Sequence, residues 1–147
     1  RFINASKTYP IETRVMQAGK PLTLNVQKIN RSDKYIIGKY DLEILTLPRT
    51  YFTVDVTQSS TVNVDIMAPG LLSYRETNSA IAQIFVIKDD GSIEWVCNLD
   101  ETVYSGSIQL QPGNYRMVYR PKALKSSTYT LEKDFRILSN KTTTKII

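Results

Sequence analysis

A pattern of residues that occurs twice constrains the fold of this chain more than any other feature. The first copy begins at Ile36 and reads IIGKYDLEIL and then, after a break that contains a proline, YFTVDVTQSSTVNVDI. The second begins at Leu110 and reads LQPGNYRMVY and then, after a polar stretch, EKDFRILSNKTTTKII. Such internal similarity indicates a repeated structural unit. Residues 38–66 and 113–147 are therefore predicted to have the same strand order.

Apolar and polar residues alternate in most segments, which is typical of half-buried strands. Strands are predicted over residues 22–29, 40–44, 52–56, 61–66, 81–87, 92–96, 107–110, 115–119, 129–137 and 142–147. The Asp89, Asp90 and Gly91 run predicts a tight hairpin turn. No segment has an apolar period of 3.6 residues, so many short strands between turns predict an all-β sandwich or barrel. The Ala-Pro-Gly break at 68–70 divides the chain into predicted modules 1–68 and 69–147.

The strand period also predicts which side chains form the core and which form the corners. The predicted core set is Leu42, Ile44, Val54, Val56, Met117, Phe135 and Ile137. Tyr40 and Tyr115 occupy matching places in the two copies, each two residues after a glycine. A tyrosine placed there can bury its ring and bond its hydroxyl to a loop backbone, as in Greek-key sandwiches. Contact with a ligand is the alternative role for these two tyrosines.

The residues that most enzymes use are scarce in this chain. Histidine is absent, which removes Ser-His-Asp and Cys-His nucleophile systems, and no phosphate-binding glycine loop occurs. The acidic pairs at 89–90 and 100–101 are interpreted as turn residues, because they lack the spacing of a calcium loop. The sequence therefore predicts no catalytic residue, cofactor or metal. A carboxylate-based catalytic domain is the remaining enzymatic alternative.

Cys97 is the single cysteine of the chain, so no intrachain disulfide forms. It is expected to be a small core residue, and a reactive thiol is the alternative. The net charge of +5 is modest for a nucleic-acid-binding domain, and no nucleic-acid partner is expected. One basic cluster, which is interpreted as a solvated face or alternatively as an anion-binding patch, consists of Arg116, Arg120, Lys122 and Lys125.

No apolar run reaches the roughly 18–20 residues of a membrane span, so none is predicted in this segment. The N-terminus lacks an initiator methionine and the apolar core of a signal peptide. The chain is therefore expected to be a piece of a longer protein.

Five longer motifs follow one another along the chain: GKYDLEILTLPR from Gly38, APGLL from Ala68, DGSIEWVCNL from Asp90, LQPGNYRMVYR from Leu110 and FRILSNKTT from Phe135. In this order they resemble the region after the von Willebrand factor A domain in large envelope proteins of Bacteroidetes. The resemblance implies non-catalytic β-modules similar to transthyretin-like, carboxypeptidase-regulatory-like or Ig-like sandwiches, and residence in the cell envelope. The metal motif of the A domain, D-x-S-x-S, is not present, so the resemblance transfers no functional site.

Together these observations predict two tandem antiparallel β-sandwich modules that serve as a spacer and a protein-interaction platform. The expected partner is an upstream domain of the same protein or a second copy of the chain. The alternative function is carbohydrate binding, which needs aromatic side chains exposed on one face. The aromatic residues available for it are Tyr74, Trp95, Tyr104 and Tyr119. Trp95 lies in an apolar segment and is expected in the core.

Overall fold

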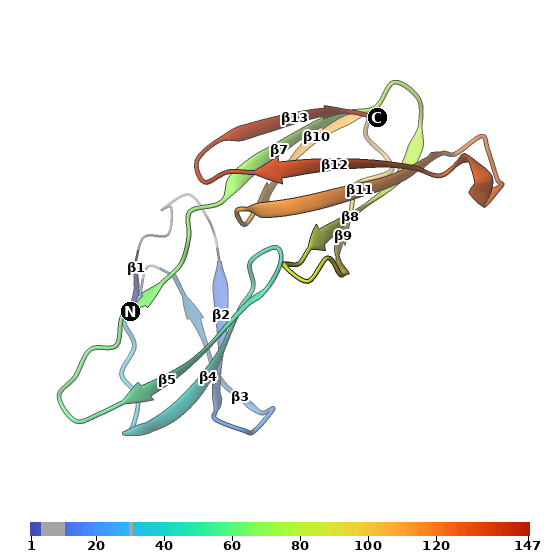
Figure 1. Ribbon diagram of the computed structural model, residues 1–147. Helices are drawn as coiled ribbons and strands as arrows, with labels where there is room; N and C mark the ends of the chain where they lie inside the picture. Colours follow the sequence, from blue (N-terminus) through green and yellow to red (C-terminus); the bar gives the residue numbers. More distant parts are fainter. Residues whose placement is uncertain (4–10, 30) are drawn as a thin grey trace. The chain divides into compact units, whose positions relative to one another are not determined.

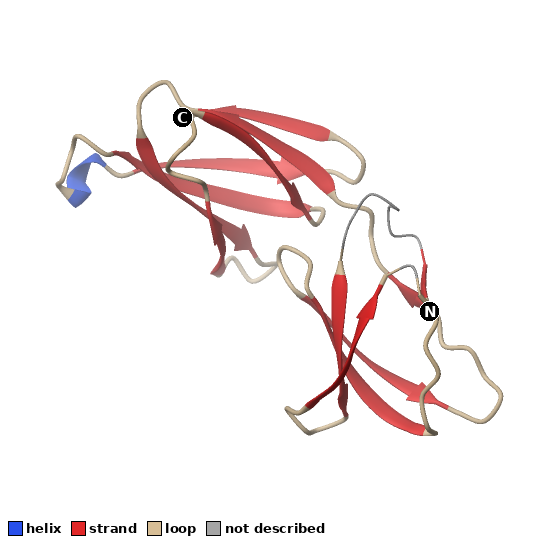
Figure 2. Ribbon diagram, turned by 180° about the vertical axis from the view of Figure 1, so that it is seen from behind, coloured by secondary structure: helices blue, strands red, loops and turns tan. Residues whose placement is uncertain are grey.

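Figure 1 presents the computed structural model of the chain, which describes residues 1–3, 11–29 and 31–147. These residues form two compact units, Arg1–Ala68 (unit 1) and Pro69–Ile147 (unit 2). Strands joined by loops make up most of both units, as Figure 2 shows, and the described residues include no α-helix. A single 3₁₀ turn at Ser127–Tyr129 is the helical element among them. The all-β prediction is confirmed. No helix in the described part of the chain is long and apolar enough to cross a membrane.

Unit 2 is a sandwich of a three-stranded and a four-stranded sheet. The three-stranded sheet has the order β10-β7-β13, and the four-stranded sheet has the order β12-β11-β8-β9. The strands are β7 (Gly70–Arg75), β8 (Ala80–Ile87), β9 (Ile93–Asn98), β10 (Ser105–Leu110), β11 (Gly113–Pro121), β12 (Leu131–Ile137) and β13 (Thr142–Ile146). Each sheet contributes fully buried side chains, such as Leu72 and Leu110 from one and Ile84 and Met117 from the other. Figure 1 shows the strands of the two sheets of this unit.

Unit 1 pairs a four-stranded sheet with two short strands. The four-stranded sheet has the order β3-β2-β4-β5, and β1 pairs with β6 in parallel. The strands are β1 (Phe2–Ile3), β2 (Glu12–Gln17), β3 (Thr23–Lys28), β4 (Gly38–Ile44), β5 (Thr50–Val56) and β6 (Val64–Asp65). The core joins Val15, Leu42 and Ile44 of the large sheet to Phe2 and Val64 of the small one. Strand β6 is shorter than the segment 61–66 that the alternation predicts.

The two units share a strand order. In each, the strand that begins with the repeated glycine pairs antiparallel with the next strand, β4 with β5 and β11 with β12. On its other side it pairs with the second strand of the unit, β2 or β8. The last strand of each unit pairs in parallel with the first, β6 with β1 and β13 with β7. The predicted repeat of strand order between 38–66 and 113–147 is confirmed.

One strand of unit 2 has no counterpart among the described residues of unit 1. Strand β10 pairs antiparallel with β7, the first strand of its unit. In unit 1 the equivalent stretch between β3 and β4 includes residues 31–37, and these form no strand. The described part of unit 1 therefore contains a two-stranded sheet where unit 2 has three strands.

The predicted corner tyrosines are confirmed. The Tyr40 hydroxyl donates to the carbonyl oxygen of Ile36 over 2.8 Å, and the Tyr115 hydroxyl donates to that of Gln111 over 2.6 Å. Both acceptors lie four residues upstream, so each ring closes the turn that precedes its strand. Tyr115 also stacks on Phe135 with ring centroids 5.6 Å apart.

Most of the predicted core is buried. Leu42, Ile44, Met117, Phe135 and Ile137 have exposed fractions of 7% or less. Val54 and Val56 are only half-buried, although they pack against the core of unit 1. Their strand, β5, is an edge strand, and the sheet opposite it has only two short strands. The prediction of full burial is therefore wrong for these two valines.

Candidate functional site

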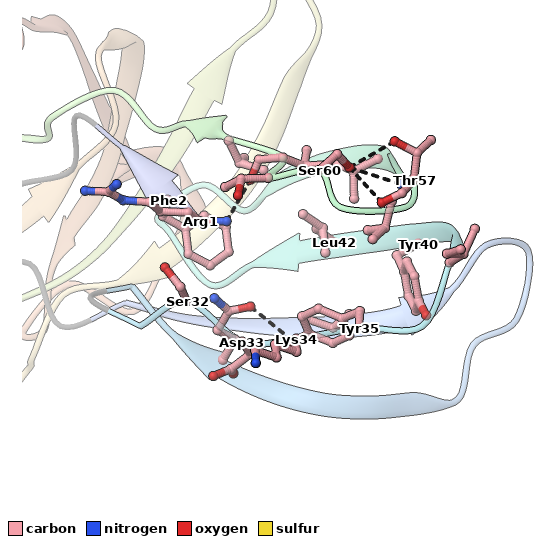
Figure 3. Close-up of a pocket in the computed structure, with 18 of the residues that line it drawn as sticks. Arg1, Phe2, Ser32, Asp33, Lys34, Tyr35, Tyr40, Leu42, Thr57 and Ser60 are labelled. Atoms are coloured by element: carbon pink, nitrogen blue, oxygen red, sulfur yellow. Dashed lines mark hydrogen bonds between the residues drawn. The ribbon is translucent and has the colours of Figure 1, made fainter.

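The described residues of unit 1 form a hollow beside its two short strands. Its volume is about 610 Å³. Its floor is apolar and comes from the inner sides of β2, β4 and β5, including Val15, Leu42 and Val56. Figure 3 shows Arg1 and Phe2 on one side of it and Asp33, Lys34 and Tyr35 on the other. We call this hollow the unit 1 slot.

Tyr35 holds the coil 31–37 against strand β3 at the side of the slot. Its hydroxyl donates to Gln27 Oε1 over 3.0 Å and accepts from Asn25 Nδ2 over 2.9 Å. Gln27 Nε2 in turn donates to the carbonyl oxygen of Arg31 over 2.7 Å. Desolvation by the surrounding protein raises the pKa of Tyr35 above its ordinary value. Burial thus favours the neutral phenol, and the hydrogen-bond network holds the coil in position.

The opposite rim is the loop 57–62, which makes hydrogen bonds of its own. The Ser60 hydroxyl donates to the carbonyl oxygen of Thr57 over 2.9 Å, and Ser59 has a positive φ of 54°. The α-amino group of Arg1 donates to the carbonyl oxygen of Val62 over 2.7 Å. The ionisable side chains that line the slot are Arg1, Asp33, Lys34, Tyr35 and Tyr40. These residues do not pair a nucleophile with a base. The slot is suited to binding an apolar group.

Trp95 lies on the outer surface of unit 2, so the prediction that it belongs to the core is wrong. Its side chain is 55% exposed. The pairing of β8 with β9 shifts register after Ile84, so that Trp95 lies opposite Phe85 while Cys97 lies opposite Ile84. Ile84 is fully buried, and alternation places Phe85 and Trp95 on the other face of the sheet. A bulge of this kind reverses the face that simple alternation predicts.

Trp95 is surrounded by apolar and amide side chains of β8 and β9. Its indole N–H donates to Asn98 Oδ1 over 3.1 Å, and Gln83 Nε2 donates to the same oxygen over 3.1 Å. Cross-strand pairs place Gln83 beside Asn98 and Ile87 beside Ile93 on this face. We call the surface the Trp95 face, and its members are Ile81, Gln83, Phe85, Ile87, Ile93, Trp95 and Asn98.

The other aromatic residues that were predicted as carbohydrate-binding candidates do not lie on the Trp95 face. Tyr74 and Tyr119 are buried in unit 2 with exposed fractions of 6% and 7%. Desolvation raises the pKa of Tyr74, in keeping with its interior position. Tyr104 is 64% exposed, but it lies in the loop between β9 and β10 rather than on the sheet face.

The basic candidates are mostly paired. Arg116 bonds to Asp134 over 2.7 Å and lies 3.3 Å from Glu132, and these contacts raise the pKa of Arg116. Lys122 lies 3.3 Å from a carboxylate oxygen of Glu101. The Arg120 guanidinium donates to the backbone oxygen of Lys125 over 3.0 Å. Since carboxylates neutralise two of the four cations, the cluster does not present a concentrated positive charge.

Asp90 and Asp100, one member of each acidic pair, accept hydrogen bonds within their own turns. Asp90 Oδ1 accepts from the backbone N–H of Ser92 over 2.9 Å, and Asp100 Oδ1 accepts from that of Thr102 over the same distance. Hydrogen bonds from these neighbours lower the pKa of both carboxyl groups. No group of three or more His, Cys, Asp or Glu side chains that could hold a metal ion converges within the described ranges. Gly91 has a φ of 81°, as the predicted hairpin requires.

Cys97 is half-buried in β9. Desolvation raises the pKa of its thiol to about 11. The thiol therefore stays protonated near neutral pH, which disfavours the reactive alternative.

The unit 1 slot was not predicted from the sequence. Its coil and loop belong to segments that carry no chemical motif. A signal does exist in the repeat, because the stretch from Lys28 to Gly38 is shorter than the matching stretch from Asn98 to Gly113. The shorter stretch leaves less chain for a strand equivalent to β10.

Comparison with known proteins places the chain in no established family. No family model matches the sequence, and no curated protein matches it. Among solved structures it is similar to the Bacillus anthracis TIE protein, with 13% sequence identity and a TM-score of 0.36. The match covers 94% of this chain and 30% of that one. A similarity at this level supports no inference about function.

Proposed function

We propose that this chain is a non-catalytic accessory region of a larger bacterial cell-envelope protein, in which two β-sandwiches act as a spacer and a protein-interaction platform. The resemblance of its motifs to the region after the von Willebrand factor A domain supports the envelope setting. The observation that carries the binding role is the Trp95 face. A solvent-exposed tryptophan lies there among Ile81, Phe85 and Ile93 on the outer face of the four-stranded sheet.

The chemistry of this face suits a protein partner. Trp95, Ile81 and Ile93 are 55%, 37% and 46% exposed, so a partner that covers them removes apolar surface from water. Exposed apolar patches with polar rims mark interaction sites, and tryptophan is enriched among the residues that dominate binding energy. Gln83 and Asn98 supply amides at the edge. The partner is an upstream domain of the same protein or a second copy of the chain.

A sedimentation experiment tests the platform role. The full chain and the separately produced upstream domain are each examined alone and mixed, by sedimentation velocity over a range of concentrations. We expect either self-association of the chain or binding to the upstream domain. Trp95→Ala is expected to weaken that association at least tenfold. Tyr104→Ala is the matched control, because Tyr104 is also an exposed aromatic residue but lies off the face. Association that is absent, or is unaffected by Trp95→Ala, contradicts the proposal.

Carbohydrate binding is the second candidate, and one observation favours it. The Trp95 ring is exposed beside the amide groups of Gln83 and Asn98, an arrangement that can stack on a sugar and bond to its hydroxyls. The burial of Tyr74 and Tyr119 weakens the carbohydrate-binding hypothesis, because these two rings cannot add to the exposed aromatic surface. A glycan-array signal that Trp95→Ala abolishes and Tyr104→Ala preserves would establish this role.

A further inference from the structure

We propose that the unit 1 slot accepts an extended β-strand from another polypeptide chain. The strand completes unit 1 as β10 completes unit 2. This inference deepens the proposed interaction role by naming a class of partner. It uses a surface of unit 1, whereas the binding role above depends on the Trp95 face of unit 2.

In unit 2, strand β10 occupies the position that is equivalent to the unit 1 slot. Strand β10 runs antiparallel to β7, with Ile108 opposite Leu72 and Leu110 opposite Gly70. Leu110 is fully buried and Ile108 is half-buried, so alternate residues of β10 fill the core between the sheets. In unit 1 the first strand, β1, has β6 as its neighbour, and no other described strand pairs with it.

The backbone of β1 has an edge available for pairing. The carbonyl oxygens of Arg1 and Ile3 accept from the N–H groups of Val64 and Ile66 in and beside β6, over 2.8 and 3.2 Å. Successive residues of a strand direct their backbone groups to opposite edges. The N–H and carbonyl groups of Phe2 therefore point away from β6. Unpaired backbone groups at a sheet edge are a template for an added strand.

The slot lies beside this edge. Arg1 and Phe2 form one of its sides, and the coil with Asp33, Lys34 and Tyr35 forms the other (Figure 3). Between them the floor is apolar, and Val54 and Val56 on it are only half-buried. A volume of about 610 Å³ is within the range of roughly 300–1,000 Å³ found for ligand sites. The slot thus offers both backbone partners and apolar surface.

These features define the chemistry of the occupant. It is an extended segment with an apolar side chain at every second position, because alternate side chains of an added strand face the floor. Ile37, which is 62% exposed, lines the slot and gives a further apolar contact. Two cationic side chains, Arg1 and Lys34, line it against one acidic side chain, Asp33. This excess of positive charge favours an occupant that has an acidic residue beside its apolar stretch.

The test uses the sequence of β10 as the probe. A fluorescently labelled peptide with the sequence of residues 105–112, SGSIQLQP, is titrated with the full chain, and binding is followed by fluorescence anisotropy. We expect saturable binding, and a scrambled peptide with adjacent Ile and Leu is expected to bind at least tenfold more weakly. On binding, hydrogen exchange of the Phe2 amide is expected to slow at least tenfold.

Two neighbouring isoleucines provide a matched pair of variants. Ile37→Asp places a charge in the slot, and we expect it to weaken peptide binding at least tenfold. Ile36→Asp is the control, because Ile36 is 84% exposed and does not line the slot. Both side chains are exposed, so neither change removes a core contact. Thermal unfolding of each variant checks the fold before binding is measured.

Three results would overturn the inference. They are equal binding of the scrambled peptide, equal binding to the Ile37→Asp variant, and no protection of the Phe2 amide. An apolar dye that enters the slot while the peptide does not bind would instead indicate a small apolar ligand. Failure here is distinguishable from failure of the platform role, because Trp95→Ala is expected to leave peptide binding unchanged.

Discussion

The Tyr35 hydroxyl donates to Oε1 of Gln27 over 3.0 Å, and this bond ties a strandless coil to the edge strand β3. Gln27 has an exposed fraction of 5% and lies on the inner side of β3. A buried amide requires partners, and the tyrosine of the coil supplies one. In unit 1 a side-chain network thus holds the coil at one side of the slot, whereas unit 2 has strand β10 in its three-stranded sheet.

Tyr35→Phe is expected to lower the free energy of unfolding by about 1–3 kcal/mol, because it removes the hydroxyl donor of the buried Gln27 Oε1. Urea denaturation followed by circular dichroism measures the change. Tyr51→Phe is the control, since Tyr51 is 66% exposed. Equal stability of the Tyr35→Phe variant and the parent would show that solvent replaces the network.

Phe135→Ala is expected to destabilise unit 2 by about 3–5 kcal/mol. Phe135 is 7% exposed and stacks on the corner residue Tyr115, so its removal leaves a cavity beside a fully buried ring. Calorimetric unfolding of the variant gives the difference. Leu131→Ala, in the same strand but at a 52% exposed position, is expected to cost much less. A small effect of Phe135→Ala would mean that the core collapses around the vacancy.

Gly70→Ala is expected to destabilise unit 2 by about 1–3 kcal/mol or more. A Cβ atom at this position would overlap the backbone oxygen of Leu138 and lie 2.6 Å from Cγ2 of Ile137. Backbone cannot move aside as a flexible side chain does. Gly113→Ala is the comparison, because its Cβ would be no nearer than 3.5 Å to Tyr115. The ranking of the two variants by chemical denaturation checks this prediction, and an equal loss in both would contradict it.

The Cys97 thiol is expected to make stability fall at alkaline pH. Burial raises its pKa in the folded chain from 9.0 to about 11, so above pH 9 the unfolded chain releases this proton more readily. Proton release that favours the unfolded state lowers the free energy of unfolding as pH rises from about 9 to about 11. Below pH 9 both states are protonated and the contribution is constant.

Urea denaturation at a series of pH values measures this decline. It is expected to be smaller in Cys97→Ser, which lacks the thiol. Labelling of the parent with a disulfide reagent at pH 8 is expected to be slow until urea is added. Rapid labelling of the folded chain would show that the thiol is accessible and ionised.

The residue pattern alone predicts much of this structure, since local periodicity determines which segments can be strands and which face of a strand is apolar. The repeat, the Asp89–Gly91 hairpin and the burial of Leu42 and Met117 depend on patterns within a few residues. The hydroxyl bonds of Tyr40 and Tyr115 depend on the same local geometry, because each acceptor is four residues upstream.

Tertiary structure decides the features on which the proposals rest. A one-residue bulge between β8 and β9 places Trp95 outside, and such a shift depends on the pairing of two strands rather than on either sequence. The unit 1 slot likewise depends on β1, which has one neighbour among the described strands, whereas β7 has two. The sequence by itself determined the strands and their apolar faces, because side-chain direction alternates along the chain. Only the three-dimensional pairing decided which faces and edges remain open, because that depends on which distant segments meet.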